Sequence, residues 1–139
     1  MINSPILVKR LQVLASQFLS LKNVESINLC LSKEDNHRLT IEVRGRKHGE
    51  YFTLEFVEDV ENAGLILYRI TRKRYDHPTE EVLFEYGENI NSVSIPLMEE
   101  DAYKRIKAII DVFRLGSAKK QGELIAYLRG KTDNNPLWE

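Results

Sequence analysis

The spacing of apolar residues changes twice along the chain. In the first part they recur every three or four positions, which is typical of one buried face on an amphipathic helix. These positions are Leu7, Leu11, Leu14, Phe18 and Leu21. Ser4 and Pro5 precede them, and serine and proline are favoured at the cap and first position of a helix. The pattern predicts a helix of about 17 residues that begins near Pro5 and buries one face.

From about residue 26 to residue 86, apolar residues alternate with polar ones. This period of two predicts strands with one buried face and one wet face. The inward positions are expected to be Ile27, Leu29, Leu31, Leu39, Ile41, Val43, Phe52, Leu54, Phe56, Ile66, Tyr68, Ile70, Val82, Phe84 and Tyr86. A last short strand is expected around Val93 and Ile95. Short linking segments rich in turn-forming residues favour hairpins, and hence an antiparallel meander.

After Pro96 the helical spacing returns. One helix is expected to end at Gly116, and Ser117 is a candidate cap for a final helix that ends near Gly130. Gly122 inside that last segment weakens the expectation, because glycine is a poor helix former. The expected fold is α+β: a two-layer open-faced sandwich with a meander of five or six strands. The N-terminal helix and one or two C-terminal helices cover one face.

The length of 139 residues fits one domain, expected over residues 1–130, with a mobile tail over residues 131–139. A chain of this size hides enough surface to form a core without metals or disulfides. Residues on the shared inward faces are expected to meet in that core. They are Leu14, Phe18, Ile41, Leu54, Phe56, Ile106 and Phe113.

The net charge of −1 hides a separation of charge along the sheet. In a meander, successive turns alternate between the two ends of the sheet, so the turns 45–49 and 76–79 share one end. Positive residues flank these two turns, while acidic residues flank the turns expected at the other end. The acidic residues are Glu34, Asp35, Glu58, Asp59, Glu61 and Glu88. The fold should therefore be basic at one end and acidic at the other.

The basic turns are a candidate anion-binding surface. Its residues are Arg44, Arg46, Lys47, Arg72, Lys73, Arg74 and Tyr75. Arginine pairs with two phosphate or carboxylate oxygens at once, and a tyrosine offers a stacking face for an unpaired base. The competing interpretation is that the charges are solvated and partly neutralised by nearby acids, among them Glu50 and Glu81. Charged strand ends also oppose aggregation.

A second candidate surface lies on the open face of the sheet. Strict alternation places Leu65, Leu67 and Leu83 on that face. Leucines on an otherwise polar face usually mark an interface, so they suggest a homodimer or another protein partner. The alternative is that the final helix covers them.

No catalytic signature is visible, and a non-enzymatic protein without a cofactor is expected. His37, His48 and His77 fall in expected loops without the spacing of metal ligands, so no metal site is expected. Cys30, the single cysteine, falls on a polar strand face and is expected to be unreactive. One cysteine and no signal peptide favour the cytoplasm, and no run is long enough for a membrane span.

The sequence favours a small binding or regulatory protein that acts through protein–protein contacts. Two alternatives remain open at this point. The first is a nucleic-acid-binding regulator that uses the basic turns, whose binding would depend on salt. The second is a small-ligand carrier or an enzyme with a pocket between the helices and the sheet.

Overall fold

The computed structural model describes residues 5–31, 36–87 and 90–137. In chain order, the elements are α1 (Pro5–Leu19), β1 (Val24–Cys30), β2 (Arg38–Arg44), β3 (Glu50–Asp59), β4 (Gly64–Arg74), β5 (Glu81–Glu85), β6 (Ser94–Pro96), α2 (Ala102–Arg114) and α3 (Ala118–Leu128). No described helix is both long and apolar enough to cross a membrane.

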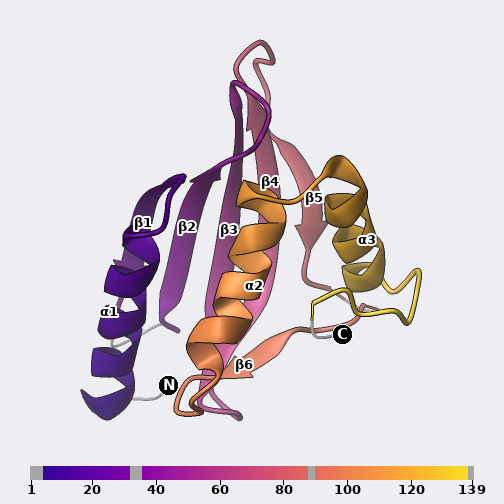
Figure 1. Ribbon diagram of the computed structural model, residues 1–139. Coiled ribbons are helices and arrows are strands. Elements are labelled where there is room, and N and C mark those ends of the chain that lie inside the picture. Colours follow the sequence, from indigo (N-terminus) through magenta and orange to yellow (C-terminus); the bar gives the residue numbers. More distant parts are fainter. Residues whose placement is uncertain (1–4, 32–35, 88–89, 138–139) are drawn as a thin grey trace.

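The strands form one antiparallel sheet in the order β1-β2-β3-β4-β5, which confirms the predicted meander. β6 leaves this order and pairs with the first residues of β4, from Gly64 to Ile66. All three helices lie on one face of the sheet (Figure 1), so the predicted α+β open-faced arrangement is confirmed.

The helices follow the apolar spacing. α1 buries Leu11, Leu14 and Phe18, and the predicted cap Ser4 lies outside the described residues. The hydroxyl of Ser117 accepts a hydrogen bond from the amide of Lys120, so Ser117 caps α3 as expected. α3 forms despite Gly122, because its buried leucines supply packing that outweighs the low helix propensity of one glycine.

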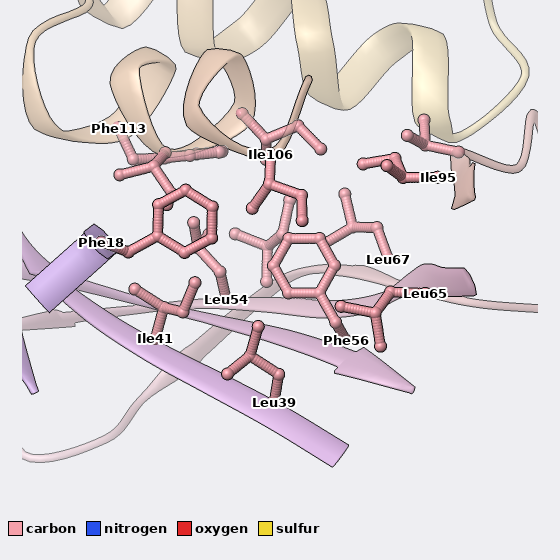
Figure 2. Packing of buried hydrophobic residues seen from close by; sticks show 14 of the residues in the cluster. Phe18, Leu39, Ile41, Leu54, Phe56, Leu65, Leu67, Ile95, Ile106 and Phe113 are labelled. Carbon is pink, nitrogen blue, oxygen red and sulfur yellow. The ribbon is translucent and has the colours of Figure 1, made fainter. Parts of the chain in front are cut away.

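The core lies between the sheet and the helices, and its predicted members are confirmed. Each of them is fully buried in one cluster: Leu14, Phe18, Ile41, Leu54, Phe56, Ile106 and Phe113. The Phe52 and Phe113 rings pack with centroids 5.0 Å apart and join β3 to α2. Figure 2 shows several of the core side chains in the space between strands and helices, among them Phe18, Phe56 and Phe113.

A bulge in β4 overturns the prediction for Leu65 and Leu67. Leu54 pairs with Ile70, but Phe56 pairs with Leu67, so one extra residue stands in β4 opposite this step. An extra residue reverses which side chains face the core, because the alternation has a period of two. Leu65 and Leu67 are therefore buried, each 1% exposed, and Figure 2 shows them among the core side chains. Ile66, expected inside, is only partly buried.

A second bulge moves Leu83. Ile70 pairs with Phe84 whereas Thr71 pairs with Val82, which leaves Leu83 as the extra residue of β5. Leu83 packs against the core, on the helix side of the sheet, instead of lying on the open face. Val82, expected inside, is 47% exposed. The three leucines consequently give no apolar patch on the open face, and the reason for expecting a homodimer there is lost.

The segment after α3 makes contacts with the domain. The Lys120 ammonium donates a hydrogen bond to the carbonyl of Pro136, and Leu137 packs against the core. Residues 138–139 of the predicted tail lie outside the described residues. The mobility of the tail stays a prediction.

Candidate anion-binding site

The tips of two hairpins meet at one end of the sheet. The amide of Tyr75 donates a 2.7 Å hydrogen bond to the carbonyl of Gly49. Gly49 has a φ of +75°, and a Cβ there would lie 2.8 Å from the Cβ of Tyr75. Only glycine accepts both this backbone conformation and this close approach. The predicted placement of Arg46 and Arg74 at the same end is confirmed, and both turns extend beyond the rest of the sheet in Figure 1.

Strand pairing divides the predicted basic residues between the two faces of the sheet. Glu50 pairs with Arg74, and Phe52 pairs with Arg72, so these arginines share the helix side with Phe52. Tyr51 pairs with both Arg44 and Lys73, which places that pair of cations on the open side. Arg44 is engaged there by Glu25 at 3.4 Å and by the Asn23 amide oxygen at 3.1 Å.

On the helix side, three cations border one hollow of about 320 Å³. Arg46 and Lys47 come from the β2–β3 turn, Arg72 comes from β4, and the start of α3 closes the remaining side. The β2–β3 turn and the start of α3 are far apart in the sequence, and only the fold brings them together. The lining residues are Arg46, Lys47, Glu50, Arg72, Gly116, Ser117, Ala118 and Gln121.

The first turn of α3 adds to the positive potential of this hollow. The leading amides of a helix have no acceptor inside the helix, and its dipole is positive at this end. Most helices place acidic residues there, but this turn has none and carries Lys119 and Lys120 instead. The sequence predicted that Ser117 caps this helix. It did not predict that the cap lies beside the basic turn, because that position depends on the tertiary structure.

Glu50 balances part of this charge. It is 8% exposed, and its carboxylate lies 4.0 Å from both Arg72 and Arg74. Arg72 also donates to Glu81, and this hydrogen bond holds the pKa of the Glu81 carboxyl below its usual value. The sequence predicted that Glu50 partly neutralises these basic residues, and its contacts with Arg72 and Arg74 agree with that prediction. Arg46 and Lys47 have no ion pair with another described residue within 4.0 Å.

Two further hollows adjoin the first at this end. Arg72, Arg74 and His77 line one, and Lys47, His48 and Arg74 help to line the other. Tyr75 lies beside the latter with 90% of its surface exposed. The predicted residues thus share an end of the sheet, but Arg46 and Arg74 line different hollows and Glu50 lies between them.

Acidic groups occupy the other end of the sheet. Asp59 accepts hydrogen bonds from Asn62 at 2.8 Å and from Ser94 at 2.5 Å. Glu58, at 7% exposure, accepts one from the amide of His37. Three of the predicted acidic residues lie outside the described residues: Glu34, Asp35 and Glu88. The predicted acidic end is therefore confirmed only for the acidic residues that the structure describes.

Hydrogen bonds from Asn62 and then Ser94 lower the pKa of Asp59 below 3.8. We expect Asp59→Asn to destabilise the fold by about 1 kcal/mol at pH 7, since bonds to a charged acceptor are stronger than bonds to a neutral one. A depressed folded pKa gives stability that is complete above pH 3.8 and is lost as the pH falls. Urea melts of both proteins should therefore converge as the pH falls through the lowered pKa of Asp59. A difference that persists unchanged at low pH would contradict this assignment.

The other chemically distinctive residues lie apart from the hollow. Cys30 is exposed on β1, and His37 is buried at the acidic end. Among the described residues, no three histidine, cysteine or acidic side chains are grouped as metal ligands.

The candidate site is a hollow whose walls carry more positive than negative charge and whose parts come from a turn, a strand and a helix start. Comparison of the chain with protein-family models, with curated proteins and with solved structures finds no match.

Proposed function

We propose that this chain is a small, non-enzymatic binding protein that recognises an anionic group of a partner protein at the hollow formed by Arg46, Lys47 and Arg72. The main support is that these three cations and the start of α3 line the same hollow. A single cysteine agrees with a reducing compartment, and we propose the cytoplasm.

The chemistry of the hollow suits a phosphate or carboxylate. The guanidinium group of Arg46 can donate two parallel hydrogen bonds to one anion, and Lys47 adds a compact positive charge. The first backbone amides of α3 lie at the positive end of the helix dipole, which also favours an anion. Arg72 is held by Glu50 and Glu81, so it is already oriented before an anion arrives. Preorganised donors lose little entropy on binding, which favours affinity.

We expect the double substitution Arg46→Ala, Lys47→Ala to weaken binding of tripolyphosphate by about tenfold or more, because two unpaired cations leave the hollow. Calorimetric titration at low salt measures the dissociation constant. The affinity of the parent protein should also fall as salt is added, because exposed charges are screened.

A matched control exists on the opposite side of the sheet. The double substitution Arg44→Ala, Lys73→Ala removes the same residue types and the same net charge from the same end. It should leave tripolyphosphate binding within about twofold, because these cations do not line the hollow. Glu50→Gln should change affinity in the opposite direction and tighten binding. Equal losses from both double variants would show that only overall charge matters and would overturn the proposed site.

A second candidate function is binding of single-stranded nucleic acid, favoured by Tyr75. Tyr75 is 90% exposed beside Lys47, His48 and Arg74, and an exposed aromatic residue among cations is suited to stack an unpaired base. Salt-dependent binding of a mixed-sequence oligonucleotide that is lost in Tyr75→Ala would support it. Binding unaffected by this substitution would exclude stacking on Tyr75.

A further inference from the structure

The basic hollow continues into a second one along α3. The second hollow measures about 310 Å³ and shares Arg72, Ala118 and Gln121 with the first. It runs past Gly122 and Ile125 and reaches the end of α3 at Arg129 and Lys131. Leu83, turned toward the helix side by the bulge in β5, contributes to the opposite wall. Together the two hollows form one groove, which we call the α3 groove.

Charge and polarity vary along the α3 groove in a definite order. Arg46, Lys47 and Arg72 lie at the start of α3, and Arg129 and Lys131 lie at its end. Between them the walls are apolar or small, formed mainly by Leu83, Gly122, Ile125 and Ala126. A ligand complementary to this surface is negative at both ends and apolar in the middle.

Gly122 leaves open space above the middle of the groove. A Cβ at this position would meet no atom within 4 Å, so no described neighbour requires a glycine here. Glycine within a helix costs about 0.5–1 kcal/mol relative to alanine, so it is unfavourable for the isolated fold. A bare backbone at this position lets an external chain approach α3 closely.

We propose that the α3 groove binds an extended acidic segment of a partner protein, with acidic residues flanking a short apolar stretch. The inference rests on the proposed function, because the basic hollow forms one end of the groove. From Ala118 to Arg129 a helix rises about 16 Å at 1.5 Å per residue. An extended chain covers that distance in about five residues at 3.3 Å each. Besides cations and aliphatic side chains, the groove walls include the carboxylate of Glu50 and the polar Ser117 and Gln121. They include no aromatic residue, which favours a peptide over stacked bases.

The test uses a fluorescein-labelled peptide in which pairs of glutamates flank a stretch of alternating alanine and leucine of about five residues. Fluorescence anisotropy measures its affinity for the whole chain. The decisive variant is Gly122→Leu, which fills the middle of the groove and improves helix propensity, so the fold should be retained. Thermal melts establish that it is.

We expect Gly122→Leu to weaken peptide binding by about tenfold or more while tripolyphosphate binding stays within about twofold. The matched control is Gly87→Leu, the same change at another glycine whose Cβ would also meet nothing within 4 Å. It should leave both affinities unchanged. A peptide with serine in place of leucine should bind more weakly, because the apolar contacts are lost.

Other outcomes overturn the inference. The inference fails if the parent protein does not bind the peptide, or if Gly122→Leu leaves the peptide affinity unchanged. It also fails if the serine peptide binds equally well, or if an oligonucleotide binds in place of the peptide and depends on Gly122. If tripolyphosphate binds and responds to Arg46→Ala, Lys47→Ala in these cases, the proposed function stands and the groove inference alone fails. If tripolyphosphate does not bind either, the proposed function itself fails.

Discussion

Truncation of Phe56 to alanine should lower the free energy of unfolding by about 3–5 kcal/mol, as expected for a large aromatic side chain removed from a core. Phe56 is fully buried in the middle of β3, between its cross-strand partners Leu39 and Leu67. It points from the sheet into the layer between strands and helices (Figure 2). Loss of the ring removes contacts with both layers at once and leaves a cavity that close-packed neighbours fill only in part.

Urea denaturation followed by circular dichroism measures this change. Val57→Ala is the matched control, because Val57 is the next residue of the same strand and faces the open side of the sheet. Its cost should stay below about 1 kcal/mol, since the side chain is only partly buried. A cost below about 1 kcal/mol for Phe56→Ala, or an equal cost for both variants, would contradict the assigned face of β3.

Replacement of Gly64 by valine should destabilise the fold by about 3 kcal/mol, at the upper part of the range for overpacked sites. A Cβ at Gly64 would lie 2.2 Å from the carbonyl oxygen of Ile95 and 2.8 Å from its carbonyl carbon. These are backbone atoms of β6, which pairs with Gly64 through Pro96. Backbone cannot rotate aside as a flexible side chain does, so β6 has to move away from β4.

The structural consequence should be local to β6. Hydrogen exchange should show weaker protection for β6, while β2 and β3 keep their protection. Gly64→Ala should act in the same direction with a smaller loss. Gly87→Val is the control, because a Cβ at Gly87 meets nothing within 4 Å. Full stability of Gly64→Val would show that β6 does not approach β4 as closely as described.

The sequence by itself determined the layers of this protein and most of its core. The helical and strand periods differ, so each segment could adopt only one regular structure that buries its apolar residues. Short links then required neighbouring strands to pair in order. For the same reason, the sequence predicts that Arg46 and Arg74 lie at one end of the sheet.

Only the tertiary structure decided which way several residues face. Two bulges determine which side of the sheet is faced by Leu65, Leu67 and Leu83. A bulge forms only when the strand pairs with its neighbour, because the extra residue is defined by that pairing. No local pattern distinguishes a regular strand from a bulged one here, because both alternate faces of these strands carry apolar residues. The predicted apolar patch on the open face was wrong for this reason.

The candidate site also required tertiary structure. The start of α3 comes beside Arg46 and Arg72 because α2 runs along the sheet toward its basic end, where a short turn leads into α3 (Figure 1). The groove along α3 follows from the same placement. The apolar pattern of a segment predicts only which face of that helix or strand is buried. Contacts between distant segments depend on how the helix layer packs on the sheet, which the pattern does not predict.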